Sequence, residues 1–176
     1  MRNGLLDASR LRRQPLRINC DLSHRIITQL AELGGVRMAT MLAHIKIKAG
    51  SETAYEDIQS WLYQQTHAHE PSIGRYEFFR GQTPGEYYGL LSFDDFNGFI
   101  QHQCSDYHET FVGQFGALVD SSTFTWIDPL PNASTLAPTK AQPLPENASE
   151  TARKYEAMLG VQEPTWWREL SGENDS

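Results

Sequence analysis

The feature that most constrains the fold is the order in which two hydrophobic patterns follow one another between residues 41 and 130. A period of two residues predicts a strand with one apolar face, and a spacing of three to four predicts a helix. Residues 41–49 alternate, so they are expected to form a strand. Its apolar face would hold Met41, Ala43, Ile45 and Ile47. Gly50 ends this strand, and Ser51 suits the start of a helix that continues to about His67. The apolar side of that helix is expected to hold Ala54, Ile58, Trp61, Leu62 and Gln65.

The remaining patterns complete a recognisable order of elements. Three further strands are expected at residues 75–80, 86–93 and 121–128. A helix over residues 96–118, broken near Ser105, connects the last two strands. The resulting β-α-β-β-α-β order predicts an α+β protein of the ferredoxin-like type, with helices on one face of a four-stranded antiparallel sheet. The opposite sheet face would be left open, so we expect a homodimer that covers it.

Two extensions flank this central domain. Residues 1–40 are expected to form an N-terminal extension with one short helix at Leu22–Leu33. Residues 131–176 begin with a proline-rich linker and continue as a helical tail, with one helix expected over residues 149–159. The aromatic pair Trp166-Trp167 follows, and it is expected to pack against another part of the molecule.

Charge and composition exclude several classes of partner. The net charge is −7, and residues 41–130 alone carry −8, which argues against a nucleic-acid interface. No apolar run approaches the roughly 20 residues that span a bilayer, so no membrane partner is expected. The two cysteines, Cys20 and Cys104, show no metal-ligand spacing. We therefore expect no metal cofactor, and a reducing, cytoplasmic location is the default.

One stretch carries a resemblance to a known family. An aromatic residue, Phe93, ends the third strand, His102 follows nine positions later, and Ser105, His108 and Phe111 follow at steps of three. This pattern resembles the antibiotic biosynthesis monooxygenase family, with Phe93 where tryptophan is common. The resemblance covers about 90 of the 176 residues and implies a dimeric α/β barrel.

The resemblance also implies a chemistry. Members of that family include enzymes that oxidise phenolic or quinol substrates with O₂ and use neither metal nor flavin. By this resemblance His102 and His108 would relay a proton, and Tyr76 would orient a small aromatic ligand through its hydroxyl. A histidine suits such a relay because its ordinary pKa lies near neutrality. The ligand pocket would be lined by His44, Phe93, Phe99, Phe111 and Trp126.

Other interpretations remain open from the sequence. Ser105 equally suits the cap of a second helical piece, and His108 equally suits a hydrogen bond to a backbone carbonyl. A non-catalytic domain that binds a ligand, or that serves only dimerisation, would carry the same pattern. Haem degradation is disfavoured, because the positions that haem-degrading relatives fill with Asn, Trp and a ligating His hold Ala43, His102 and Val112 here.

Overall fold

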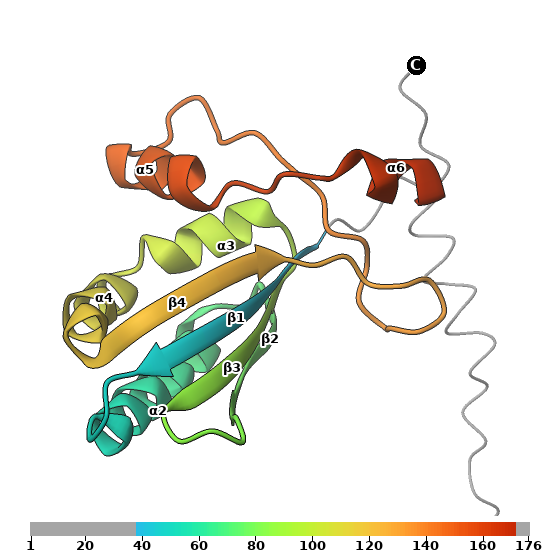
Figure 1. The fold of residues 1–176 in the computed structure, drawn as a ribbon. Coiled ribbons are helices and arrows are strands. Elements are labelled where there is room, and N and C mark those ends of the chain that lie inside the picture. The colour runs from blue at the N-terminus through green and yellow to red at the C-terminus, as the bar shows by residue number, and fades with distance from the viewer. Residues whose placement is uncertain (1–37, 172–176) are drawn as a thin grey trace, which may run out of the picture. The chain divides into compact units, whose positions relative to one another are not determined.

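A computed structural model describes residues 38–171, which form the predicted β-α-β-β-α-β order followed by two more helices (Figure 1). The elements are β1 (Ala39–Ile47), α2 (Glu52–His69), β2 (Ile73–Arg80), β3 (Glu86–Phe93), α3 (Phe96–Gln103), α4 (Asp106–Leu118), β4 (Val119–Trp126), α5 (Glu150–Leu159) and α6 (Thr165–Ser171). The ferredoxin-like α+β fold is therefore confirmed. The helix expected at Leu22–Leu33 lies outside the described residues.

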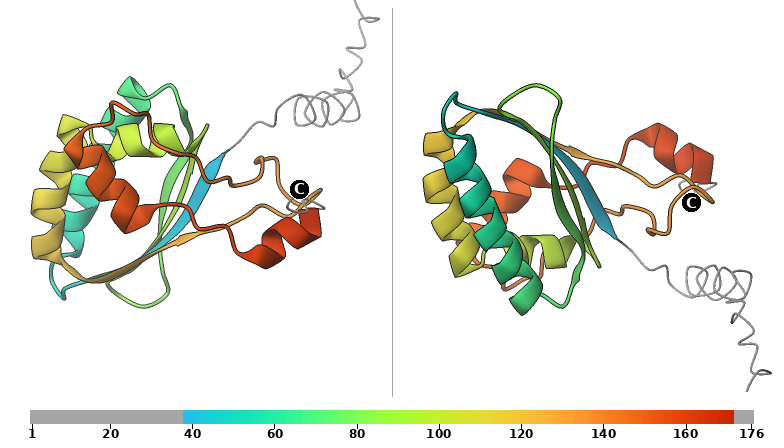
Figure 2. Two further views of the ribbon diagram at one scale, coloured as in Figure 1. Left: turned by 90° about the horizontal axis from the view of Figure 1, so that it is seen from above. Right: turned by 90° about the horizontal axis from the view of Figure 1, so that it is seen from below.

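The four strands form one antiparallel sheet in the order β2-β3-β1-β4. Met41 in β1 lies opposite Leu91 in β3 and Trp126 in β4, so these three side chains share the face that α2, α3 and α4 cover (Figure 2). The odd-numbered residues of β1 are buried on this face, as the alternation predicts. The core therefore lies between the helices and one side of the sheet.

The prediction for the buried side of α2 is wrong by about one residue around the helix. Trp61 is exposed and Ala54 is exposed, whereas the buried residues are Tyr55, Gln59, Leu62 and Thr66. The apolar pattern alone favours burial of Trp61. The structure instead turns two polar side chains, Gln59 and Thr66, toward the interior. The interior beside α2 therefore contains polar side chains as well as apolar ones.

The break that was predicted near Ser105 separates α3 from α4. Asp95 accepts a hydrogen bond from the Gly98 amide at 2.7 Å and so caps α3. Ser105 caps α4 by accepting from the His108 amide at 3.3 Å, and its hydroxyl donates to the His102 carbonyl at 2.8 Å. These bonds fix the angle between the two helices, and they bring His102 and His108 together.

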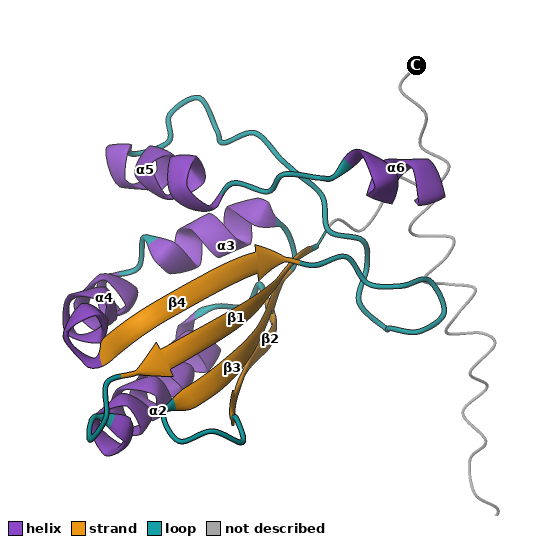
Figure 3. Cartoon of the chain, in the orientation of Figure 1, coloured by secondary structure: helices purple, strands orange, loops and turns teal. Residues whose placement is uncertain are grey.

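The segment after β4 returns to the domain as a long loop before α5 begins (Figure 3). Thr139 anchors the loop, because the Met38 amide donates to the neighbouring Pro138 carbonyl and the Thr139 hydroxyl donates to Ile127. The helix α5 lies over α3 (Figure 1), where Ala152 is buried. Ser149 caps α5 by accepting a hydrogen bond from the Ala152 amide at 3.1 Å.

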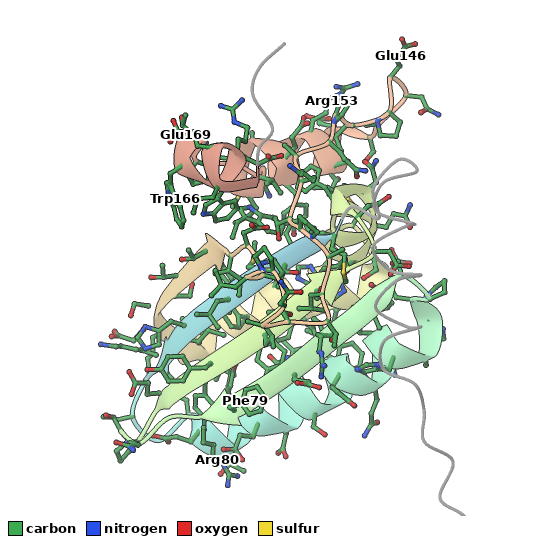
Figure 4. All side chains as sticks on the ribbon, turned by 90° about the vertical axis from the view of Figure 1, so that its right-hand side faces the viewer. Phe79, Arg80, Glu146, Arg153, Trp166 and Glu169 are labelled. Carbon is green, nitrogen blue, oxygen red and sulfur yellow. The ribbon has the colours of Figure 1, made fainter. Side chains whose placement is uncertain are left out.

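The sheet face opposite the helices carries no element in front of it among residues 38–171 (Figure 4). We call it the open sheet face. Leu42, Phe79 and Tyr88 project from it and are between 36% and 52% exposed. In the C-terminal helix α6, Trp166 and Trp167 pack edge to face, yet Trp166 remains 58% exposed. No helix within residues 38–171 is long and apolar enough to cross a membrane.

Candidate functional site

A cavity of about 260 Å³ lies between the helix-covered face of the sheet and the helices α2, α4 and α5. We call it the central cavity. Its walls are largely apolar and come from β1, β3, α4 and β4. They include Met41, Ala43, Ile45, Leu91, Phe111, Phe115 and Phe124. Such walls exclude water from a bound ligand and strengthen any polar interaction made inside the cavity.

One part of the lining of the central cavity is polar and buried, and we call this part its inner end. Gln59, Tyr76, His102, Gln103 and His108 all line it, and each is less than 9% exposed. Neither polar atom of the Gln59 side chain has a hydrogen-bond partner among residues 38–171, and Nε2 of His102 has none either. A buried polar group without a partner costs free energy, so its presence on a cavity wall favours a ligand that satisfies it.

His102 is held by a carboxylate. Its Nδ1 lies 2.7 Å from Oε1 of Glu70, the residue that ends α2, and the Tyr107 hydroxyl donates to the same oxygen. An ionised carboxylate can only accept, so Nδ1 of His102 carries a hydrogen and Nε2 is directed to the cavity. The His102 ring is 1% exposed and is flanked by Phe93 and Tyr76, with ring centroids 5.4 and 5.1 Å away. Carboxylate and rings together fix the orientation of this imidazole.

His108 lies beside His102 but in a different electrostatic environment. The two ring centroids are 4.7 Å apart. Nδ1 of His108 lies 3.1 Å from the Gln103 carbonyl, which can only accept, so this nitrogen also carries a hydrogen. Burial, and then repulsion from His102, lowers the pKa of His108 to about 3. His108 is therefore a neutral imidazole at neutral pH, with a lone pair on Nε2.

The tyrosines of the site are held in their neutral form. Burial raises the pKa of Tyr76 above its ordinary value, and its hydroxyl faces Gln59 and Thr66 without hydrogen-bond geometry. Burial, together with the hydrogen bond to Glu70, raises the pKa of Tyr107 to about 12. Both side chains can therefore donate a hydrogen bond at physiological pH, but neither supplies a base.

The structure brings together some of the residues that the sequence predicted for the pocket. Tyr76, His102, His108 and Phe111 line the central cavity. His44 does not, because it lies on the open sheet face, where Nε2 is 2.8 Å from Glu86 and the ring stacks on Tyr88.

Three predicted aromatic residues also lie outside the lining. Phe93 and Phe99 are fully buried and pack edge to face, with ring centroids 5.5 Å apart. Trp126 packs on Phe96 and Phe99, and its indole nitrogen donates to the Leu159 carbonyl at 2.9 Å. Phe93 supports His102 from behind, so it acts on the site only through that ring.

Several residues of the site were missed from the sequence, and four of them matter most for its chemistry and shape. Gln59 and Glu70 come from α2 and its end, and Tyr155 and Met158 come from α5. The spacing of Tyr55, Gln59, Leu62 and Thr66 is helical and could have identified the buried Gln59. Glu70 is 32 residues from His102 along the chain, and no local pattern points to their contact.

A second hollow is larger but has a different character. It is an open groove of about 720 Å³ between α2 and β2, and it is lined in part by Glu56, Tyr63, Arg80 and Tyr87. Arg80 and Tyr87 both bind Glu56, and the hydrogen bond from Arg80 does most to lower the pKa of that carboxyl to about 2. The charged side chains Glu56 and Arg80 of this groove therefore pair with each other at the surface. For this reason we place the functional site in the central cavity.

Metal-ligating residues do not gather in the part of the chain that the structure describes. No group of three or more His, Cys, Asp or Glu side chains among residues 38–171 could hold a metal ion. Cys104 is half-buried and forms no disulfide with another described residue. The side chains that line the central cavity supply imidazole, phenol and amide groups, and the Glu70 carboxylate touches the site through His102.

Comparison with known proteins gives matches among solved structures only. No family model matches the chain, and no curated protein matches it. A structure from Caulobacter crescentus, named provisionally as an antibiotic biosynthesis monooxygenase, matches with a TM-score of 0.52 and 19% identity, over 58% of this chain and 99% of that one. A structure from Bacteroides thetaiotaomicron with the same provisional name matches with a TM-score of 0.54 and 13% identity, over 57% of this chain and 96% of that one.

A third structure with the same provisional name, from Nitrosomonas europaea, has a TM-score of 0.51 and 11% identity over 56% of this chain and 95% of that one. Over about half of its length, this chain therefore has the fold of structures named in this way. The matches span nearly the whole of each neighbour. More than 40% of this chain accordingly has no counterpart in them.

Proposed function

We propose that this protein is a cofactor-independent monooxygenase that oxidises a small phenol or quinol with O₂. The observation that carries the proposal is His102, a buried imidazole with Nδ1 held by Glu70 and with Nε2 unpartnered on a cavity wall. A base fixed in this way can exchange a proton only with a molecule that enters the cavity. The names of the neighbours that share the fold support the same class of reaction.

The size of the central cavity supports a substrate of one or two rings. Cavities of about 150 Å³ bind benzene, and pockets for drug-sized ligands begin near 300 Å³. The central cavity, at about 260 Å³, lies between these values. The flat apolar walls suit an aromatic ring, and the polar inner end suits its hydroxyl groups.

The proposed reaction begins with a proton transfer. Nε2 of His102 takes the proton of a substrate hydroxyl, and Glu70 stabilises the imidazolium that forms. The phenolate or quinolate that remains is electron-rich and reduces O₂ directly. A C–O bond forms at a ring carbon to give a hydroperoxide, whose O–O bond then breaks with loss of water. One quinol and one O₂ give one hydroxylated quinone and one water, so the substrate supplies every electron.

The neighbouring side chains would position the substrate and keep the site dry. Tyr76 and Gln59 lie at the inner end and can hydrogen-bond a second hydroxyl or carbonyl of the ring. Neutral His108 offers a lone pair, and it adds no positive charge that would repel the imidazolium formed on His102. Apolar walls exclude water that would otherwise quench the anion by protonation.

The test of this proposal is O₂ uptake by the purified full chain with a panel of one- and two-ring quinols. His102→Gln should lower kcat by about 10²-fold or more, as loss of a general base does, while the melting temperature stays close to that of the wild type. The matched control is His67→Gln, which replaces an exposed histidine of α2. Full turnover by well-folded His102→Gln would refute the assigned role.

Glu70 is a positioning residue, and its variant needs a separate readout. Glu70→Gln should lower kcat at an unchanged KM, because the neutral amide no longer stabilises the imidazolium that forms during proton transfer, whereas the contacts that hold the substrate are kept. A merely structural role would reduce activity only in proportion to the folded fraction.

A second candidate function is non-catalytic binding of the same class of ligand. It is favoured by α5, because Tyr155, Met158 and Leu159 line the central cavity from outside the β-α-β-β-α-β domain. A helix that partly closes a cavity suits a protein that stores or senses a ligand. Tight quinol binding without O₂ uptake would select this function over the oxygenase.

We further propose that a second copy of the chain covers the open sheet face. Supporting this, Leu42, Phe79 and Tyr88 expose apolar surface on a face that no described element shields. Two such faces packed against each other would bury these side chains in one interface. The central cavity lies on the other side of the sheet, so each copy would keep its own.

A further inference from the structure

The outer end of the central cavity is apolar, in contrast to its inner end. Three of its lining side chains are also exposed to solvent: Val112 of α4 and Phe124 of β4, each 40% exposed, and Met158 of α5, 64% exposed. A residue that both lines a cavity and reaches solvent lies at its opening. We call these three residues the mouth (α4, β4 and α5 are seen together in Figure 1).

The charge of the lining narrows the chemistry of the ligand. Among residues 38–171, no Lys, Arg, Asp or Glu lines the central cavity. A carboxylated or phosphorylated ligand would lose its hydration and gain no counter-ion there. Gln59 and His102, in contrast, present unpartnered polar atoms at the inner end, where neutral hydroxyl or carbonyl groups would satisfy them. The cavity is therefore polar inside, apolar outside and uncharged throughout.

The helix α5 is fixed in place where it forms one side of the mouth. The Tyr155 hydroxyl donates to Glu109 of α4 at 2.5 Å, and the Leu159 carbonyl accepts from the Trp126 indole at 2.9 Å. These bonds tie the middle of α5 to α4 and its C-terminal end to β4. Met158 lies between the two bonded residues, so its side chain is presented to the opening by a firmly held backbone.

We propose that the central cavity binds an alkyl-substituted phenol or quinol with the ring hydroxyls inward and the alkyl chain leaving through the mouth between Val112, Phe124 and Met158. This inference rests on the proposed function, because it specifies the substrate of that same site. The α5 helix, through Met158, then selects for the apolar substituent. A bare ring would leave the mouth side chains exposed to water, whereas an alkyl chain would cover them.

The test is binding of hydroquinone and its 2-methyl, 2-propyl and 2-pentyl derivatives to the full chain, measured by calorimetry without O₂. Burial of each methylene should tighten binding about fourfold until the alkyl chain has passed the mouth. Met158→Glu should cut the affinity gain per methylene to half or less, because a charge at the opening disfavours an alkyl chain. Phe124→Thr should do the same and keeps a residue suited to a strand.

The matched control is Leu170→Glu, which places the same charge on an exposed apolar residue of α6, 79% exposed and away from the cavity. It should keep the wild-type gain per methylene. An affinity independent of alkyl length, or the same gain in all variants, would overturn the inference and leave the proposed function standing if hydroquinone itself binds. No binding by any hydroquinone would remove both.

Discussion

Protonation of His108 should be costly, and this cost can be measured as a dependence of stability on pH. The folded-state pKa of His108 is about 3, against an ordinary value of 6.5 that the unfolded chain should keep. As the pH falls below 6.5, the unfolded chain binds this proton and the folded chain does not. Stability is therefore present above pH 6.5 and is lost as the pH falls toward about 3.

The magnitude follows from the size of the pKa difference. Each pH unit between the two pKa values is worth about 1.4 kcal/mol, so acidification from about 6.5 to 5 should cost roughly 2 kcal/mol of unfolding free energy. Glu56 contributes little in this window, because its stabilisation is lost only as the pH falls below its ordinary pKa of 4.5 toward the folded value of about 2. Between pH 7 and 5 the contribution of His108 can thus be measured separately from that of Glu56.

The assay is urea unfolding of the wild type, His108→Gln and the control His67→Gln at pH 7, 6 and 5. The glutamine can still donate toward the Gln103 carbonyl but cannot take up a proton. We expect the pH dependence to be weaker in His108→Gln by roughly 2 kcal/mol over this range and unchanged in His67→Gln. Equal slopes in the wild type and His108→Gln would refute the assignment of His108 as a buried neutral imidazole.

Two further predictions concern assembly and autonomy. Light scattering at micromolar concentration should give about twice the chain mass of 20.0 kDa. The double substitution Leu42→Lys and Phe79→Lys on the open sheet face should shift the protein toward a monomer. A monomeric wild type would remove the dimer proposal. A chain that begins at Met38 should keep a cooperative thermal transition, because the whole β-α-β-β-α-β order and its buried cluster lie within residues 38–171, and the Met38 amide donates to the Pro138 carbonyl. A non-cooperative transition would contradict this.

The sheet and some of the helix caps could be predicted because their signals are local, although Ser51, which precedes α2 as predicted, makes no capping hydrogen bond through its side chain. Alternation over a few residues places the strands within about two positions of their observed bounds, and β3 coincides with the prediction over Glu86–Phe93. Ser105 and Ser149 cap helices through amides three residues ahead, a contact that the sequence can express directly. The alternation also puts His44 and Ile45 on opposite faces of the strand, so the pattern by itself indicates that His44 faces away from the helices.

The site could be predicted only in part because it depends on contacts between distant elements. The carboxylate of Glu70 reaches His102 across 32 residues, and Tyr155 reaches Glu109 across 46. Aromatic identity does not separate a cavity wall from a packed core either: Phe111 lines the central cavity, whereas Phe99 is fully buried behind it. Both classes of residue satisfy the same hydrophobic pattern, and only the packing of the helices distinguishes them.

The pairing of His102 with His108 would let two adjacent imidazoles take different parts in the proposed reaction. Two imidazolium ions with ring centroids 4.7 Å apart would repel each other in a buried site, so the pair can hold one added proton far more easily than two. The acceptors at Nδ1 decide where that proton goes. Glu70 supplies a full negative charge to His102, whereas the Gln103 carbonyl supplies only a dipole to His108.

Burial and then repulsion from His102 lower the pKa of His108 to about 3, which keeps the His108 ring neutral. A proton released by a bound phenol should therefore go to Nε2 of His102. His108 would remain a hydrogen-bond acceptor throughout the reaction. Replacement of Glu70 by glutamine removes the charge that distinguishes the two rings, so its effect on kcat tests this division of roles more directly than the loss of either histidine.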